Sequence, residues 1–292
     1  MRVVATPAEL RNYLEPALSQ EMSVGLVPTM GALHEGHLTL CRLANEQNHL
    51  TAVSIFVNPL QFRPGEDYHN YPRNLEADCA RLQEVGVSMV FAPDPGVMYP
   101  PGFQTHVLVE HLSASLEGAI RPGHFQGVAT VVMKLFMLAR PTRAYFGEKD
   151  FQQLQIIRRM VKDLDVPVEI VPVSIVREPD GLAMSSRNAY LSPPERAAAP
   201  AIYAALQAAC QAARSGEADA GRLIGMVQDR LAAQPLLAPD YVQIVDPETL
   251  TPAARLAGEC RMLAAVRVGS TRLIDNVMIS AGLTPLADHP AG

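Results

Sequence analysis

Apolar residues recur along the chain with two spacings, and these alternate through its first 176 residues. Short apolar, β-branched runs predict strands at residues 24–27, 51–57, 87–92 and 168–176, with a further short strand at 105–110. Apolar residues three or four positions apart predict helices at residues 7–18, 38–48, 75–85 and 131–138. Strand, helix, strand is the unit of a parallel sheet, so the pattern predicts an α/β domain.

Alanine-rich helices dominate beyond residue 193 and indicate a second, smaller domain. Helices are expected at residues 195–214 and 221–233, and strand-like segments near 241–245 and 262–268. The predicted division is an α/β domain over residues 1–176, a smaller α+β domain over residues 177–283 and a disordered tail at residues 284–292.

Charge and composition limit the class of protein. The chain has 24 basic and 30 acidic residues and no tryptophan, which argues against a nucleic-acid-binding surface. Neither an apolar run of about 18 residues nor an apolar leader is present, so we expect no membrane span, no signal peptide and a cytoplasmic location. The four cysteines show neither zinc nor disulfide spacing: Cys41, Cys79, Cys210 and Cys260.

Residues 28–38 follow a predicted strand and precede a predicted helix. Gly31 and Gly36 allow the backbone to approach a ligand, and the N–H groups at the helix start attract an anion. His34 and His37 lie three residues apart, so both imidazoles face the same ligand. The segment therefore predicts a phosphate-binding loop.

Two other interpretations of the histidine pair are open. A metal site would need a third ligand, and the metalloprotease pattern has histidines four residues apart with glutamate directly after the first. An ordinary surface loop is the other alternative, because short motifs often match by chance.

Polar side chains also follow the later elements. Asn58 and Gln61 follow the second predicted strand, where α/β sheets bind ligands, although Asn58 could equally be a turn residue. Arg121 could pair with a phosphate or carboxylate, or be an exposed loop charge.

Lys149 begins a predicted helix, which is a poor position for a cation unless an anionic ligand lies there. Its ammonium could then neutralise the charge that develops on a phosphorus centre. Gln153, one turn later, can bind a hydroxyl or a carboxylate. Residues 185–187 place two hydroxyls beside a guanidinium, which suits the outer phosphates of a nucleotide, although Ser-Ser-Arg alone is more often a helix cap.

In combination and in this order, five segments resemble the pantothenate synthetase family: residues 28–37, 54–62, 121–125, 147–150 and 184–188. The resemblance extends from residue 3 to about residue 279. It implies a Rossmann-like sheet of the nucleotidyltransferase superfamily with a HIGH-like histidine motif. The implied reaction is ATP-dependent ligation of pantoate and β-alanine to pantothenate through a pantoyl-adenylate, releasing AMP and pyrophosphate. It also implies Mg²⁺ carried with the nucleotide phosphates, a homodimer, and a smaller domain that acts as a lid.

The resemblance also implies roles for individual residues. Catalytic roles fall to His34, His37, Lys149 and Arg187, and substrate binding to Gln61, Gln153 and Arg121. The nucleotide site comprises Met30, Gly31, Ala32, Leu33, His34, Glu35, Gly36, His37, Gly147, Glu148, Lys149, Asp150, Val176, Met184, Ser185, Ser186 and Arg187. No residue is assigned as a protein ligand of the metal.

Two further functions are alternatives at this point. An adenylyltransferase of the same superfamily would leave the adenylyl group on its product. A non-catalytic nucleotide-binding protein could keep the same fold, but it would not need both histidines, Lys149 and residues 185–187 together.

Overall fold

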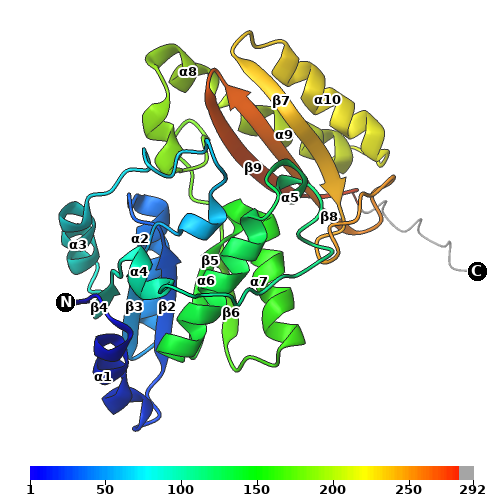
Figure 1. Cartoon of the computed structure of the whole chain (residues 1–292). Helices are drawn as coiled ribbons and strands as arrows, with labels where there is room; N and C mark the ends of the chain where they lie inside the picture. Colours follow the sequence, from blue (N-terminus) through cyan, green and yellow to red (C-terminus); the bar gives the residue numbers. More distant parts are fainter. Residues whose placement is uncertain (283–292) are drawn as a thin grey trace, which may run out of the picture. The chain divides into compact units, whose positions relative to one another are not determined.

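The strands of the first domain form one six-stranded sheet in which all neighbours are parallel. Figure 1 shows the computed structural model of the chain, which describes residues 1–282. The spatial order of the strands is β1-β4-β3-β2-β5-β6. Their bounds are β1 Arg2–Val4, β2 Val24–Thr29, β3 Leu50–Ile55, β4 Met89–Phe91, β5 Arg143–Gly147 and β6 Glu169–Val173.

The chain reverses its direction across this sheet between β2 and β5. From β2 it proceeds through β3 to β4 on one side, and from β5 to β6 on the other. Open α/β sheets bind their ligands beyond the carboxyl ends of the strands at such a reversal. The loops after β2 and β5 therefore flank the expected ligand position.

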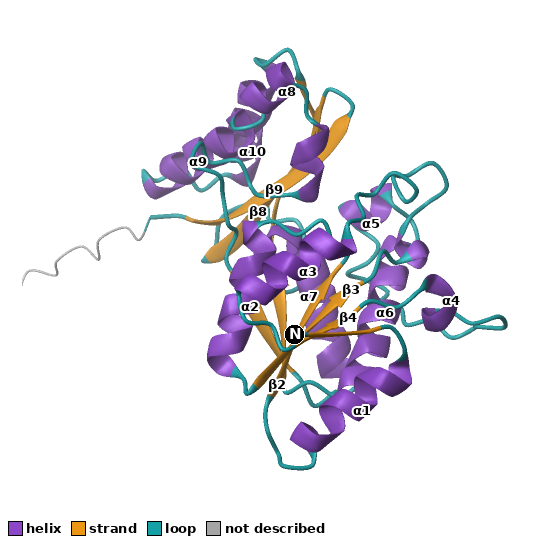
Figure 2. Cartoon of the chain, turned by 90° about the vertical axis from the view of Figure 1, so that its left-hand side faces the viewer, coloured by secondary structure: helices purple, strands orange, loops and turns teal. Residues whose placement is uncertain are grey.

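Helices cover both faces of the sheet, as Figure 2 shows. Helix α2 packs against β2, β3 and β5 and contacts α3, whereas α6 packs on β2 and contacts α1 and α7. Buried aliphatic side chains join α2 to the strands, among them Leu38, Val27 and Val53. The helices are α1 Pro7–Leu18, α2 Glu35–Gln47, α3 Leu75–Glu84, α4 Pro95–Met98, α5 Glu117–Ile120, α6 His124–Ala139 and α7 Phe151–Asp163, with 3-10 turns η1 Pro59–Gln61 and η2 Glu148–Asp150.

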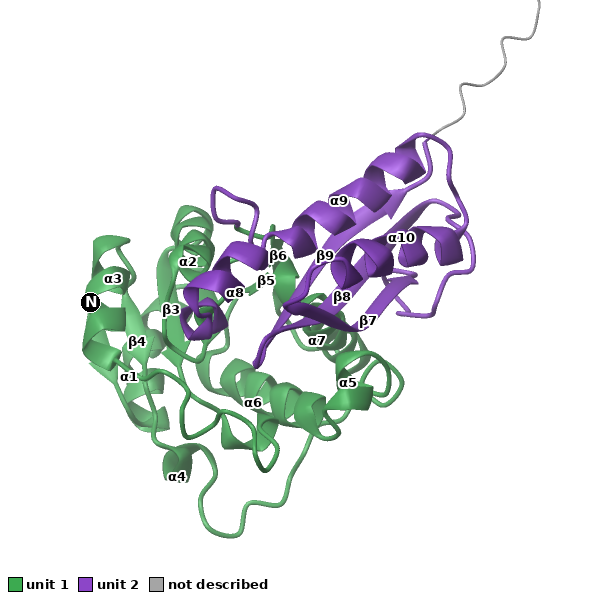
Figure 3. Ribbon diagram, turned by 90° about the horizontal axis from the view of Figure 1, so that it is seen from above, with its two compact units in different colours: residues 1–176, 184–186 green, residues 177–183, 187–292 purple. Residues whose placement is uncertain are grey.

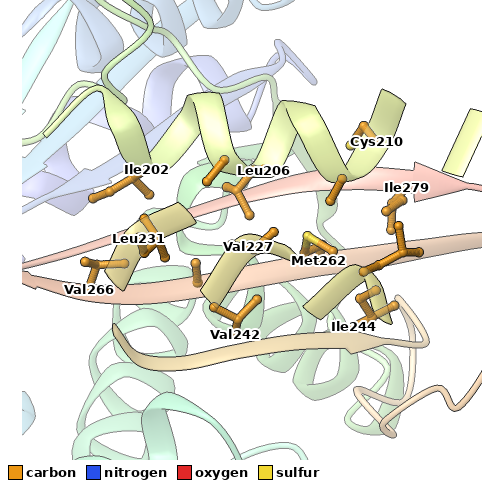
Figure 4. Close-up of a cluster of buried hydrophobic side chains, with 14 of the residues drawn as sticks. Ile202, Leu206, Cys210, Val227, Leu231, Val242, Ile244, Met262, Val266 and Ile279 are labelled. Carbon is orange, nitrogen blue, oxygen red and sulfur yellow. The ribbon is translucent and has the colours of Figure 1, made fainter. Parts of the chain in front are cut away.

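The second domain is built on an antiparallel sheet of three strands in the order β7-β8-β9. Figure 4 shows its core, in which Ile202 and Leu206 of one helix and Val227 of the next meet Met262 of the central strand. The elements are η3 Ser186–Tyr190, α8 Pro193–Ala198, α9 Ala201–Arg214, α10 Ala220–Ala232, β7 Leu237–Val245, β8 Glu259–Val268 and β9 Thr271–Ser280. The α/β sheet with a smaller α+β domain is the predicted fold class.

Contacts divide the chain into two compact units, coloured separately in Figure 3. The first comprises Met1–Val176 and Met184–Ser186, and the second comprises Arg177–Ala183 and the chain from Arg187 onward. The expected division placed residues 184–186 in the second domain. They group with the first because the Met184 N–H donates to the Val176 carbonyl at 3.0 Å and the Ser186 hydroxyl lies 3.2 Å from that of Tyr71.

Several predicted elements differ from the observed ones. The helix expected at residues 195–214 is broken into α8 and α9, because Pro200 has no N–H to continue the helical hydrogen bonds. Residues 105–110 form no strand, and the Val107 N–H donates instead to Thr130 Oγ1 at 3.0 Å. Lys149 lies in η2, two residues before α7 begins at Phe151. The disordered tail predicted at residues 284–292 lies outside the described residues.

Within residues 1–282, no helix combines the length and the apolar character that a membrane crossing requires.

Candidate functional site

Three of the predicted segments follow neighbouring strands of the parallel sheet and lie at the carboxyl ends of these strands. The histidine loop follows β2, Gln61 ends the turn after β3, and Lys149 lies just after β5. Gln61 and Met30 are in direct contact, with Gln61 Nε2 3.0 Å from Met30 Sδ. The fold thus brings together residues that are up to 119 positions apart in sequence, Met30 and Lys149, at one end of the sheet.

The two histidines lie against each other at the start of α2. Their ring centroids are 4.1 Å apart, and the His34 backbone N–H donates to His37 Nδ1 at 3.3 Å. Because Nδ1 accepts this bond, a neutral His37 carries its proton on Nε2. His37 therefore offers an N–H donor from its other ring nitrogen.

The charge state of His37 follows from its surroundings. Burial, followed by the nearby His34 and Lys149, holds the pKa of His37 well below its ordinary value. The contribution of Lys149 places that ammonium within electrostatic reach of the imidazole. At neutral pH His37 is therefore an uncharged hydrogen-bond donor.

The loop before α2 is held by internal hydrogen bonds from four consecutive backbone N–H groups. The Gly31 N–H donates to Thr29 Oγ1, those of Ala32 and Leu33 donate to the two carboxylate oxygens of Asp78 at 3.0 and 2.8 Å, and that of His34 donates to His37. These amides are therefore satisfied by protein groups. The N–H groups that the sequence predicts to attract an anion are those at the start of α2, beyond residue 34, and the assignment of residues 31–34 to the nucleotide site stays a prediction.

Asp78 is the residue of this site that the sequence interpretation missed. It is only 4% exposed, and Gly31 and Ala32 beside it both have positive φ, at 86° and 51°. A left-handed backbone at a residue other than glycine is strained, so its persistence needs compensating bonds, which Asp78 supplies. The signal in the sequence is that Asp78 lies one helical turn before buried Leu82, on the apolar face of α3.

We expect Asp78→Asn to destabilise the protein by about 1–3 kcal/mol, because one carboxylate oxygen becomes an NH₂ group facing a backbone N–H. The loop would also lose its shape, so the KM for the ATP that the family resemblance implies should rise. Thermal unfolding and steady-state kinetics measure both effects. Glu76→Gln is the matched control, since Glu76 is exposed on the same helix and should be neutral in both measurements. Equal behaviour of the two variants would contradict the role of Asp78.

A cavity of about 210 Å³ opens beside the loop at the ends of β2, β3 and β4. Met30 and Gly31 line it from the loop, Phe56 from the end of β3, and Tyr68 and Asp94 from the later connections. It lies beyond the carboxyl ends of these strands, as ligand sites in α/β sheets do, but on the β3–β4 side of the β2–β5 reversal.

Residues 184–186 also lie in the first unit, near the histidine loop. A Cβ added at Gly36 would lie 3.9 Å from the Met184 Cβ and only 2.9 Å from the His34 ring, so a side chain at this position would displace the His34 ring. Arg187 belongs to the second unit. Glu35 forms a half-exposed ion pair with Arg42 on the surface of α2.

Arg121 is engaged by protein groups rather than exposed. Its guanidinium pairs with Glu66 at 2.7 Å, and it also contacts the Gln61 carbonyl and His124. Gln153 is half-buried in the first turn of α7, whereas its neighbour Gln152 is buried and bonded to the backbone at Glu117. Of the two glutamines, Gln153 is the one with exposed surface.

Comparison with known proteins adds an independent observation. The family model described as Pantoate-beta-alanine ligase matches residues 2–278. The pantothenate synthetase of Thermus thermophilus is 55% identical over 280 residues, covering 96% of this chain and 99% of that protein. That of Heliobacterium modesticaldum is 51% identical over 279 residues, with coverage of 96% and 99%.

Solved structures agree with this result. The crystal structure of pantothenate synthetase from Thermus thermophilus has a TM-score of 0.91 and 54% identity, covering 95% of this chain and 99% of that chain. The Francisella tularensis pantoate-beta-alanine ligase, complexed with beta-gamma ATP and beta-alanine, has a TM-score of 0.79 and 33% identity, covering 95% and 97%. The chain therefore belongs to the pantoate–β-alanine ligase family.

Proposed function

We propose that this chain is the enzyme that ligates pantoate and β-alanine to pantothenate, consuming ATP and releasing AMP and pyrophosphate through a pantoyl-adenylate. The observation that carries the proposal is the convergence of the histidine loop, Gln61 and Lys149 at the reversal point of a parallel sheet. The family match over residues 2–278 supports the same activity.

In the first step, a carboxylate oxygen of pantoate attacks the α-phosphorus of ATP, and the bond to the leaving pyrophosphate breaks. Negative charge increases on the departing oxygens, so fixed donors and cations near them accelerate the step. We assign this role to the Lys149 ammonium and to the Nε2–H of neutral His37, which His34 supports. Residues 30–37, 147–150, 176 and 184–186 are the proposed nucleotide site, to which the family resemblance adds Arg187 as a further cation.

In the second step, the unprotonated amine of β-alanine attacks the acyl carbon of the adenylate. The carbon–oxygen bond to AMP breaks, and the nitrogen loses a proton as the amide forms. The mixed anhydride is sensitive to water, so the site must exclude solvent between the steps. Gln61 and Gln153 are the proposed ligands of pantoate, and a lid role for the second unit belongs to the same proposal.

The proposed substrate role of Arg121 takes a more specific form in the structure. Because its charge is already balanced by Glu66, a bound carboxylate would have to compete with that pair. We therefore propose that Arg121 acts on substrate binding through the Gln61 carbonyl that it contacts.

The test supplies the purified chain with ATP, Mg²⁺, pantoate and β-alanine. We expect AMP, pyrophosphate and pantothenate in equal amounts, and without β-alanine a single equivalent of pyrophosphate and enzyme-bound pantoyl-adenylate. Release of an adenylylated product in the complete mixture would instead identify the alternative adenylyltransferase, which the matched family does not favour.

Mg²⁺ and a homodimer complete the proposal and rest on the family resemblance, and a cytoplasmic location stays the expectation drawn from the sequence. Among residues 1–282, histidine, cysteine, aspartate and glutamate side chains form no group of three that could hold a metal. Mg²⁺ commonly takes most of its ligands from nucleotide phosphates and water, and such an ion fits this donor set. It would supply charge neutralisation at the phosphates.

A further inference from the structure

Gln61 is held by a chain of hydrogen bonds that begins at Tyr99, a residue to which neither the motifs nor the proposed function assigns a role. The Tyr99 hydroxyl donates to Asn58 Oδ1 at 2.8 Å, and Asn58 Nδ2 donates to Gln61 Oε1 at 3.1 Å. Tyr99 follows α4 and Asn58 precedes η1, so two separate connections of the first unit meet here.

The orientation of the Asn58 amide follows from backbone groups whose polarity is fixed. The Leu60 N–H can only donate, so the atom 3.2 Å from it must be the Asn58 oxygen. The Gly127 carbonyl can only accept, so the atom 3.0 Å from it must be the Asn58 nitrogen. An inverted amide would face like groups at both ends.

These bonds use the whole capacity of the Asn58 amide. Its two N–H groups donate to Gly127 and Gln61, and its oxygen accepts from Leu60 and Tyr99. With a side chain buried to 1% exposure and no capacity left, Asn58 cannot bind a substrate. Of the two roles expected for Asn58, ligand binding and a turn residue, the contacts favour the turn residue.

The orientation of Gln61 follows in turn. Its oxygen must face the Asn58 N–H, so its NH₂ group points the other way, where Met30 Sδ lies 3.0 Å from Nε2. The Gln61 carbonyl is fixed as well, by His124 Nδ1 at 2.7 Å and by Arg121. Thioether sulfur is a weak acceptor, so an oxygen lone pair of a ligand is a better partner for this NH₂ group.

We infer that Tyr99 is a positioning residue that, through Asn58, fixes the Gln61 amide with its NH₂ group toward the substrate, so that Gln61 is a donor to a substrate oxygen. Burial raises the pKa of Tyr99, so its hydroxyl keeps the proton that it donates. The inference rests on the proposed function, because it takes pantoate as the ligand of Gln61. Gln61 then binds a carboxylate or hydroxyl oxygen and cannot accept the proton that the β-alanine amine loses.

A double-mutant cycle tests the positioning role, since residues acting through one another are not additive. We expect Tyr99→Phe to lower kcat/KM for pantoate about tenfold, the effect of one lost hydrogen bond, with an unchanged KM for ATP. In a Gln61→Ala background the same change should alter kcat/KM by less than about twofold. An equal loss in both backgrounds would show that Tyr99 acts on structure alone and would overturn the inference.

Tyr145→Phe is the matched control for this cycle. The Tyr145 hydroxyl is also buried and accepts from Asn48 Nδ2 at 2.7 Å. Asn48 ends α2 and precedes β3, so this contact lies toward the amino ends of the strands, whereas Gln61 lies beyond their carboxyl ends. Tyr145→Phe should lower the melting temperature without changing kcat/KM for pantoate. A fall in kcat/KM equal to that of Tyr99→Phe would overturn the specific role of Tyr99.

Gln61→Glu tests the donor orientation separately. Glutamate keeps the shape and still accepts from Asn58, but presents an oxygen where the NH₂ group was, so kcat/KM for pantoate should fall at least as far as in Gln61→Ala. Near-normal activity of Gln61→Glu would overturn the donor assignment. If the unmutated enzyme makes pantothenate but the effects of Tyr99→Phe and Gln61→Ala add, this inference alone is overturned. If the unmutated enzyme makes no pantothenate, the proposed function is overturned and this inference with it.

Discussion

Lys149→Ala is expected to lower kcat on the order of 10²-fold or more, with a smaller change in the KM for pantoate. Its ammonium lies close enough to His37 to depress the pKa of that imidazole. In the proposed site Lys149 lies where charge accumulates on the phosphates during displacement, and the loss of one such group typically costs this much. Single-turnover formation of pyrophosphate from ATP and pantoate measures the first step directly.

Lys162→Ala supplies the control for this prediction. Lys162 lies in the last turn of α7, the helix that follows Lys149, and it is exposed. Its removal changes the net charge equally and should leave kcat within about twofold, as for a surface substitution. His37→Ala should resemble Lys149→Ala in its effect. If both His37→Ala and Lys149→Ala kept near-normal rates, the proposed site would have no support.

Gly127→Ala is expected to destabilise the protein by about 3 kcal/mol and to remove most of the activity. A Cβ at this position of α6 would collide with the Leu60 carbonyl and would lie 2.7 Å from the Gln61 backbone nitrogen. Because the obstacle is backbone, no side-chain rotation can relieve it, and η1 would have to move away from α6. Gln61 would move with η1, so the KM for pantoate should rise as the melting temperature falls.

Gly225→Ala is the opposite case in the second unit. Gly225 also lies inside a helix, α10, but a Cβ there meets nothing within 4 Å. Alanine loses less conformational entropy than glycine in a helix, so this variant should be more stable by about 0.5–1 kcal/mol. Melting temperatures that changed in the same direction for both variants would contradict the close approach of α6 and η1.

The apolar pattern of the sequence predicted most strands of the parallel sheet, because they are buried runs of β-branched residues such as those of β3. The pattern did not predict β1, whose three residues are too few to show a periodicity. It did not predict β9 either, because Arg272, Asp275 and Asn276 interrupt the apolar residues there. Asp275 is buried there because it pairs with Arg177 at 2.7 Å, a contact across 98 residues that no local window contains.

The candidate site divides in the same way. Residues that bear motifs, such as His37 and Lys149, could be proposed from sequence because their chemistry is local to a loop. Asp78 and Tyr99 act on loops that are distant in sequence, at separations of 45 and 41 residues. Their roles depend on which connections the fold places side by side, and topology rather than local pattern decides that.

The pairing of Asp78 with the loop amides has a kinetic consequence. If a loop is ordered only when its ligand binds, the free protein is rarely in the binding-competent conformation. The apparent affinity is then reduced in proportion to the fraction of the protein in that conformation. Here protein groups, the Asp78 carboxylate among them, fix the shape of the loop. For the proposed nucleotide site we therefore expect the rate of capture to be set by diffusional encounter and by the cationic side chains that steer it.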